Sequence, residues 1–265
     1  MAKAINAPAK AGTPKERKKT SPFKDYADFE KEITDFANKY KTIVATQAKR
    51  TSDYFEMSCY NYIVKFYELK GYEVTPQNLQ NGQYRYKCTP SGIQSNFSNF
   101  EAVIKNGKKE TKFEIQHNLA VQSSHDSNIY TTPDICVIAK NSVQYTKEYY
   151  DTKTTFSFVK NEKMITFCEV KQFAPFPELL FNFIGVLNEL MKEYMINEGE
   201  EDIPPHIAPS LMLSGKANKQ TNRIKDSLEK RYCVNIFYDL FYSGAYTFSK
   251  ANIDDIRCTG KIPDN

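Results

Sequence analysis

Two acidic residues and a lysine are the side chains of this sequence best suited to chemistry on a phosphodiester. Asp134 opens the apolar run 135–139, while Glu169 and Lys171 lie at the end of the apolar run 165–171. Side chains two positions apart in a strand share a face, so Glu169 and Lys171 are expected to project together. If the two runs are neighbouring strands, the two carboxylates meet and supply the hard oxygen ligands that Mg²⁺ and Mn²⁺ prefer. The lysine would then stabilise an attacking hydroxide or the negative charge developing on a phosphate, which predicts metal-dependent phosphodiester hydrolysis.

The tripeptide Glu-x-Lys carries little weight by itself, because it recurs in this chain. It begins at Glu16, Glu68, Glu110 and Glu169. The first belongs to a polar N-terminal stretch and the second to a helix end, whereas only the last lies in a strongly apolar strand followed by a long apolar helix. Partial burial of a carboxylate and an ammonium costs several kcal/mol unless they are paired or bind a metal. The buried context therefore selects Glu169 with its lysine.

Further site residues are less firmly indicated. The backbone carbonyl of Val170 is a possible third metal ligand. On the helix expected near residue 60, a rotation of 100° per residue places Glu56 on the flank of the apolar stripe and Glu68 well away from it. Glu56 is thus the preferred fourth catalytic candidate, although a solvated carboxylate at a helix edge is an equally good interpretation. Glu114 is another candidate ligand, and Gln172 ranks lower because it points to the opposite face of its strand.

A basic stripe on an amphipathic helix in the last quarter of the chain is the best candidate for contact with DNA. Lys219, Arg223 and Lys230 fall on one side of it, and Lys216 precedes its start. A loop leading into a helix N-terminus also offers free backbone N–H groups to which a phosphate can bind. An ordinary amphipathic surface helix explains the pattern equally well, because Asp226 interrupts the stripe.

The elements that must position these residues follow from the periodicity of apolar side chains. Helices are expected over residues 25–49, 52–70, 178–195 and 218–232. Antiparallel strands are expected within 83–121, followed by strands over 135–139, 165–171, 210–213 and 234–240, with a polar, tyrosine-rich hairpin or excursion over 140–162. Strand, helix and strand in succession at the end predict a parallel crossover, so the fold class is α/β.

Charge and composition bound the organisation of the chain. The formal net charge is +4, but residues 1–20 hold six Lys and Arg residues against one Glu. Their +5 leaves the remaining body at −1, so any surface for nucleic acid must be a local basic patch. Residues 1–22 lack a periodic apolar pattern and are expected to be a disordered basic arm. Residues 23–265 are expected to form a single domain.

The cysteines and the apolar segments predict a soluble, cytoplasmic protein. The six cysteines lie far apart and without metal-binding spacing, so they are expected to be reduced thiols of the core. No stretch approaches the length of a membrane span, and no secretory signal is visible. The three histidines, His117, His125 and His206, show no ligand spacing to one another and are expected to be structural.

With Pro133-Asp134 and Glu169-Val170-Lys171, the chain resembles the PD-(D/E)XK nuclease superfamily. The order of expected elements over about residues 52–240 is similar as well. The resemblance implies a restriction-endonuclease-like mixed central sheet flanked by helices, one or two Mg²⁺ or Mn²⁺ ions, and DNA as substrate. It also implies endonuclease activity, with restriction or anti-phage defence as an associated role. The 35 positions between Asp134 and Glu169 are long for this family, which an excursion over 140–162 would explain.

Other functions remain open at this stage. A catalytically silent nucleic-acid-binding or interaction module on the same fold is the main alternative, although the retention of Asp134, Glu169 and Lys171 together argues against it. An RNA-cleaving or structure-specific nuclease, or one activated by a partner or small molecule, fits the same residues. Cutting both strands of a duplex commonly requires two active sites, so a homodimer or a complex with a partner protein is a further possibility.

Overall fold

The computed structural model describes residues 34–35, 38–39, 51–106, 109–147, 155–190, 206–240 and 253–259. The basic arm expected over 1–22 and most of the helix expected over 25–49 lie outside these residues. None of the helices in the described ranges is both long enough and apolar enough to cross a membrane.

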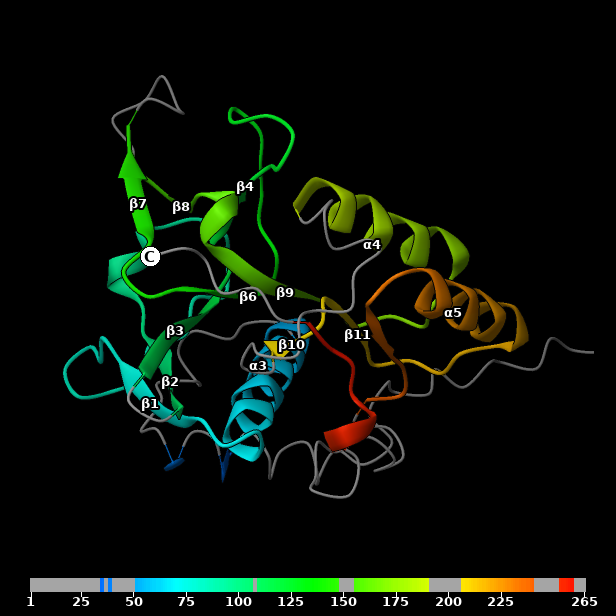
Figure 1. Cartoon of the computed structure of the whole chain (residues 1–265), viewed down its shortest axis with the longest axis horizontal. Helices are drawn as coiled ribbons and strands as arrows, with labels where there is room; N and C mark the ends of the chain where they lie inside the picture. The colour runs from blue at the N-terminus through cyan, green and yellow to red at the C-terminus, as the bar shows by residue number, and fades with distance from the viewer. Residues whose placement is uncertain are drawn as a thin grey trace, which may run out of the picture.

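A seven-stranded mixed sheet forms the centre of the fold (Figure 1). Its strands are β1 (Glu73–Gln77), β2 (Asn99–Asn106), β3 (Lys109–His117), β6 (Ile135–Ala139), β9 (Met164–Lys171), β11 (Ser210–Leu213) and β12 (Asn235–Phe237). They follow one another across the sheet in that order, antiparallel as far as β9. From β9 through β11 to β12 the pairing is parallel, as the crossover predicted. The mixed α/β class is confirmed, and β6 and β9 are direct neighbours.

Helices pack on both faces of this sheet. The long helix α3 (Thr51–Leu69) shares a core with Ile165, Cys168 and Val170 of β9. The other face of β9 carries Phe167, which packs with α4 (Pro177–Leu190) and α5 (Lys219–Arg231). The strand β9, which ends in the Glu-x-Lys tripeptide, is therefore covered on both sides.

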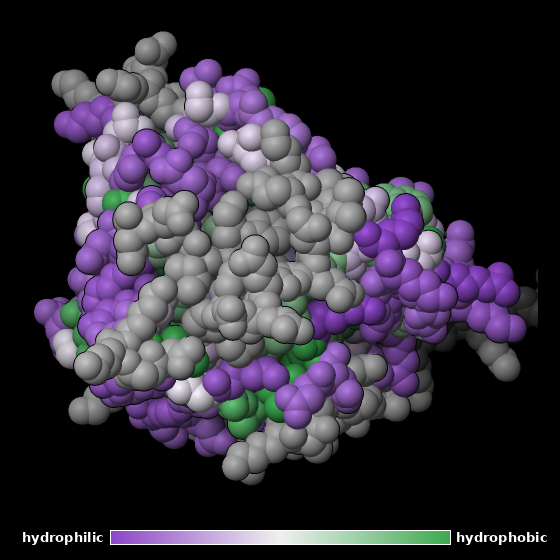
Figure 2. Space-filling model, viewed as in Figure 1, coloured by the Kyte–Doolittle hydropathy of each residue, from purple (hydrophilic) through white to green (hydrophobic). Residues whose placement is uncertain are grey.

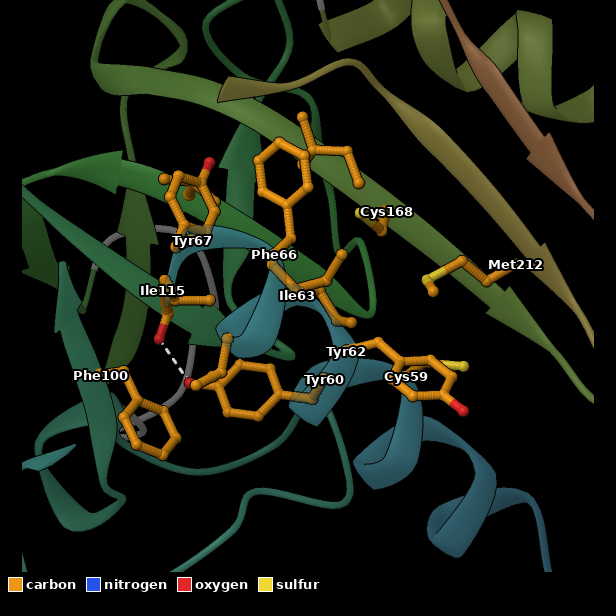
Figure 3. Close-up of a cluster of buried hydrophobic side chains, with 14 of the residues drawn as sticks. Cys59, Tyr60, Tyr62, Ile63, Phe66, Tyr67, Phe100, Ile115, Cys168 and Met212 are labelled. Atoms are coloured by element: carbon orange, nitrogen blue, oxygen red, sulfur yellow. Dashed lines mark hydrogen bonds between the residues drawn. The ribbon is translucent and has the colours of Figure 1, made fainter. Parts of the chain in front are cut away.

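The helix α3 agrees with the expected range but is more deeply buried than expected. Gly71, with φ of +89°, follows its end. A single apolar stripe was predicted, yet side chains on nearly all sides are buried, including Met57, Tyr60 and Val64. Figure 3 shows this cluster, in which the hydroxyl of Tyr60 donates to the carbonyl oxygen of Ile115 at 2.5 Å. The packing fixes α3, and with it Glu56, against the sheet.

The excursion between β6 and β9 is a hairpin that belongs to a second sheet. Its strands β7 (Val143–Thr146) and β8 (Phe156–Val159) pair antiparallel. They join β4 (Ala120–Gln122) and β5 (Tyr130–Thr131) in a four-stranded sheet ordered β5-β4-β8-β7. No strand from the described part of this excursion enters the seven-stranded sheet, so the long separation of Asp134 and Glu169 leaves β6 and β9 adjacent.

The remaining elements are short. Two strands, β10 (His206–Ile207) and β13 (Cys258–Thr259), pair with each other, and single 3-10 turns occur at η1 (Gln94–Asn96), η2 (Asn161–Lys163) and η4 (Ile253–Asp255). All six cysteines are free thiols, four of them buried, which confirms the expected reduced state.

Candidate active site

Asp134 and Glu169 lie at the same end of the adjacent strands β6 and β9. Asp134 immediately precedes β6, and its Oδ2 accepts a hydrogen bond of 2.6 Å from the backbone N–H of Val170. Because Cys168 and Val170 pack in the core with α3, Glu169 and Lys171 project to the opposite face, as strand alternation predicts. The structure thus brings together the two carboxylates and the backbone of Val170. Whether the carbonyl of Val170 binds a metal stays a prediction.

The ammonium group of Lys171 sits between the two carboxylates. Its Nζ lies 2.7 Å from Oδ2 of Asp134 and 2.8 Å from Oε2 of Glu169. The side chains of Asp134 and Glu169 are only 14% and 13% exposed, whereas that of Lys171 is 33% exposed. Charge-assisted hydrogen bonds of this length are strong in such an environment. The three residues form one compact, mostly buried ionic group with partial access to solvent.

This arrangement raises the pKa of Glu169 and that of Lys171. Burial and then the negative charge of Asp134 raise the pKa of Glu169 to about 7, against the opposing effect of Lys171. For Lys171, burial acts to lower the pKa, but attraction to Glu169 and Asp134 outweighs it and holds the pKa above its ordinary value. The charged form of Lys171 is therefore favoured, and Glu169 binds a proton more readily than an ordinary carboxylate.

Glu56 reaches the same group from α3. Burial, then repulsion from Asp134, raises its pKa to about 8, while Lys171 lowers it. The side chain of Asn118 hydrogen-bonds to Glu56, and the nearby Asp53 adds negative charge. Glu68, which helical geometry placed away from the core, forms an exposed ion pair with Lys39 at 3.0 Å. Glu56, rather than Glu68, is therefore the glutamate of α3 that lies beside Asp134.

The donor atoms fit a hard divalent cation. Among the residues that the structure describes, no three side chains of His, Cys, Asp and Glu gather as a complete metal cage. Mg²⁺, however, is usually held by one or two carboxylates together with water, and Asp134 and Glu169 provide two buried carboxylates at one point. Because Lys171 lies between them, its Nζ has to move toward solvent for an ion to bind both. The pair suits Mg²⁺ or Mn²⁺.

Two other candidates have local roles or no assigned contact. Glu114 on β3 accepts hydrogen bonds from the side chain of Gln116 at 2.8 Å and from the backbone N–H of Asn141 at 2.9 Å. Its carboxylate therefore holds the sheet together, which does not support a role as ligand. Gln172 follows β9 and is half-buried.

Two of the three histidines, His117 and His206, are buried and hydrogen-bonded within the fold, whereas His125 is exposed. His117 is fully buried between the backbone N–H of Lys87 and the carbonyl of Ser98, and its burial lowers the pKa to about 3. His206 is also buried, and its ring nitrogen hydrogen-bonds with the hydroxyl of Tyr67. His125 contacts the carbonyl oxygen of Asn188 on α4 at 2.8 Å.

The basic side chains selected for DNA contact are exposed in the structure. They are Lys216, Lys219, Arg223 and Lys230, and Figure 2 shows hydrophilic residues over the part of the surface where Figure 1 places α5. The start of α5 differs from expectation, because the side chain of Asn218 caps it by accepting hydrogen bonds from the N–H groups of Gln220 and Thr221. Those donors are not free for a phosphate, and contact of the four exposed side chains with DNA stays a prediction.

Asn118 is a site residue that sequence analysis missed. It has φ of +49°, a conformation that Asn adopts more readily than most residues. Its backbone N–H donates to the carbonyl of Asp134 at 3.0 Å, and its side chain donates to the carbonyl of Lys87 at 2.9 Å. The side chain of Asn118 also hydrogen-bonds to Glu56, so Asn118 connects Asp134 to Glu56. An Asn directly after a strand was the only available signal.

Tyr86 is the second missed residue. Its ring stacks on His117 with 4.1 Å between centroids, and its buried hydroxyl has no hydrogen-bond partner among the described residues. Burial, then the negative charge of Glu56, raises the pKa of Tyr86, so this ring lies close to the acidic group. Nothing in the sequence around position 86 distinguishes it from the other tyrosines.

Glu56→Gln is expected to stabilise the metal-free protein at high pH. Because folding raises the pKa of Glu56 to about 8, this residue favours the folded state only while it is protonated, and its favourable contribution is lost as pH rises through that value. Urea unfolding in EDTA should show the variant more stable by roughly 2 kcal/mol at about pH 9 and nearly unchanged at about pH 5. The matched control is Glu68→Gln. An equal effect of Glu56→Gln at both pH values would contradict this electrostatic account.

The described residues together present a defined chemical group. Two carboxylates and a lysine meet at the ends of β6 and β9, and a third carboxylate approaches from α3. Such a group can hold a divalent cation, stabilise negative charge on a phosphate and accept a proton near neutral pH. No protein-family model, no curated protein and no solved structure matches this chain.

Proposed function

We propose that this protein is a divalent-metal-dependent nuclease that hydrolyses phosphodiester bonds of DNA, as an endonuclease. The observation that supports the proposal most is the position of Lys171 Nζ, 2.7 Å from Asp134 and 2.8 Å from Glu169, at the ends of two neighbouring strands. Two distant parts of the sequence, one with Asp134 and one with Glu169 and Lys171, meet in the combination that the PD-(D/E)XK resemblance implies. In the Glu68 tripeptide, Lys70 also pairs with an aspartate, Asp254, but that carboxylate is 90% exposed and Glu68 pairs with Lys39 instead. In the Glu110 tripeptide, the lysine pairs with the exposed Glu110.

The order of elements also supports the proposal. Helix α3, the antiparallel strands β1 to β3, the Asp134 strand and the Glu169 strand are followed by α4, β11, α5 and β12. This succession agrees with a restriction-endonuclease-like fold, in which a mixed sheet is flanked by helices. The hairpin of β7 and β8 accounts for the additional residues between the two motif strands.

In the proposed mechanism, Asp134 and Glu169 would hold Mg²⁺ or Mn²⁺, which when bound would supply polarisation of the phosphate and a lower pKa for water. Lys171, released toward solvent from its two ion pairs, places its ammonium group against the negative charge that develops on the phosphate. Glu56, whose pKa is about 8, would accept the proton of the attacking water in its deprotonated form, so this step is favoured as pH rises through that value. Asn118 keeps Glu56 and Asp134 in register through its two hydrogen bonds.

Cleavage of supercoiled plasmid tests the proposal. The wild-type protein is expected to cut with Mg²⁺ or Mn²⁺ and to stop in EDTA, and Asp134→Ala, Glu169→Ala and Lys171→Ala should each be inactive. Glu110→Ala is the matched control, because Glu110 and Lys112 form the same tripeptide as an exposed ion pair of 2.7 Å on β3. Undiminished cutting by the three site variants would rule out this active site.

A catalytically silent nucleic-acid-binding module is the second candidate. The observation that favours it is that Lys171 already neutralises part of the charge of Asp134 and Glu169, so the fold does not need an ion at this point. Metal titration separates the two. If calorimetry detects no binding of Mn²⁺ and Glu169→Ala binds DNA like the wild type, the silent module replaces the nuclease.

A further inference from the structure

Two phenylalanines that follow the Glu-x-Lys strand are exposed to solvent. Phe173 is 58% and Phe176 is 45% exposed, although large apolar side chains elsewhere in the described residues are mostly buried. Phe173 follows Lys171 by two residues and Phe176 by five, so both belong to the segment between β9 and α4. Exposed aromatic rings beside a site are a common means of contacting a ligand.

The backbone that carries these rings is fixed on several sides. The N–H of Phe173 donates to the carbonyl of Lys171 at 2.8 Å, and its own carbonyl accepts from Gly215 at 3.0 Å. The carbonyl of Phe176 accepts from Leu179 and Leu180 at the start of α4. Phe173 and Phe176 are thus held in place by hydrogen bonds, which reduces the entropy lost when a ligand binds.

The contact between Phe173 and Gly215 joins the segment after β9 to the loop before α5, which carries basic side chains. A Cβ atom on Gly215 would lie 2.4 Å from the Cα of Ala174, so the two backbones touch. Lys216 directly follows this contact, and Lys219 and Arg223 lie on the exposed side of α5. In Figure 1, β9 and β11 run side by side, and the chain continues from them into α4 and α5. The backbone of Phe173 and Ala174 therefore contacts the loop that leads into the basic side of α5, directly after the strand that ends at Lys171.

We propose that Phe173 and Phe176 form a stacking platform for an unpaired base of the DNA substrate, while Lys216, Lys219 and Arg223 contact the adjoining phosphates. Bases in an intact duplex are stacked on one another, so flat rings at the surface gain a stacking partner only where a base is unpaired. Proteins that bind single strands combine such rings with a positively charged surface. The inference rests on the proposed nuclease function and names its substrate class, DNA with an unpaired nucleotide beside the bond to be cut.

A binding experiment tests the platform separately from catalysis. The probes are a DNA duplex with one unpaired 2-aminopurine and the same duplex fully paired, each titrated with the full-length protein in EDTA and again in Ca²⁺. Wild-type protein is expected to bind the unpaired probe about tenfold more tightly and to quench its fluorescence by stacking. Phe173→Ala and Phe173→Leu should lose that preference and the quenching, because leucine is apolar but lacks a flat ring.

Tyr145→Ala is the matched control, since Tyr145 is 47% exposed on β7 of the other sheet. Equal affinity for both probes, or a Phe173→Ala variant that binds and quenches like Tyr145→Ala, would overturn the platform. Plasmid cleavage is measured on the same preparations. Metal-dependent cutting without a preference for the unpaired probe would refute the platform alone, whereas base stacking without any cutting would support the platform and refute the nuclease.

Discussion

Replacing Lys171 with methionine is expected to lower the rate of DNA cleavage by about 100- to 1,000-fold, the usual loss when one group that stabilises transition-state charge is removed. Methionine keeps much of the length and volume of lysine but has no charge. The proposed role of Lys171 lies in the rate of the chemical step, because its ammonium group balances negative charge that grows on the phosphate. Single-turnover cleavage of a labelled DNA at saturating Mn²⁺ measures that step directly.

The Lys171→Met substitution should raise the affinity for Mn²⁺ although it lowers the cleavage rate. Lys171 competes with a cation for the oxygens of Asp134 and Glu169, which it contacts at 2.7 and 2.8 Å. Lys171→Met is therefore expected to bind Mn²⁺ more tightly than the wild type while cutting more slowly. Lys112→Met, which removes an exposed lysine of the same tripeptide on β3, is the control and should change neither quantity. Loss of metal binding together with cleavage would show that Lys171 only maintains the structure.

Gly215→Ala is expected to destabilise the protein by about 2 to 3 kcal/mol, within the range for overpacking in a close contact. The new Cβ would lie 2.4 Å from the Cα and 2.7 Å from the N of Ala174, and 2.8 Å from the carbonyl oxygen of Phe173. All three are backbone atoms, so no side chain can rotate away and the loop after β9 has to shift. Urea unfolding followed by circular dichroism measures the loss.

Gly185→Ala provides the comparison for this substitution. Gly185 lies within α4, and a Cβ there meets no atom within 4 Å. Alanine has a higher helix propensity than glycine, so this variant should gain about 1 kcal/mol. If Gly215→Ala unfolds at the same urea concentration as the wild type, then the tight contact between the two loops does not exist in solution.

The strands that carry the catalytic candidates could be predicted because their signal is local. The run 135–139 is apolar throughout and becomes β6, and Glu169 with Lys171 ends the equally apolar β9. Burial on both faces requires such runs, and it also makes charged residues within them conspicuous. The pairing of β6 with β9 was only assumed as a condition from the sequence, and the structure supplies it. Glu56 followed from helical rotation, since only one side of the first turns of α3 can face Asp134.

Contacts between distant segments could not be predicted in this way. Asn118 and Tyr86 reach the acidic group through the path of the chain after β3 and before β2. Lys87 shows a second limit: it is 1% exposed, donates to Gln94 at 2.8 Å, and its burial lowers the pKa to about 8. A lysine in a polar stretch ordinarily indicates a solvated position. Its partner Gln94 lies only seven positions further on, in the 3-10 turn η1, but the sequence pattern did not indicate that the two side chains meet.

The bounds of α5 were predicted closely, but the hydrogen bonding at its N-terminus was predicted wrongly. The range 218–232 was close to the observed Lys219–Arg231. Free N–H groups were expected at its first turn, but Asn218 and Thr221 form a reciprocal capping box there. The short polar side chains that favour helix starts are the same ones that occupy the donors.

Binding of Mn²⁺ and cleavage of DNA, followed in the same samples of wild-type protein and Asp134→Asn, test whether Asp134 forms part of a metal-dependent nuclease site. Electron paramagnetic resonance of free Mn²⁺ reports binding, and gel analysis of a labelled DNA reports cutting. Cleavage by the wild type is expected to appear over the Mn²⁺ concentrations at which the ion binds, and Asp134→Asn should lose both. Cleavage that persists in EDTA, or that is unaffected by Asp134→Asn, would contradict a metal-dependent nuclease site formed by Asp134, Glu169 and Lys171.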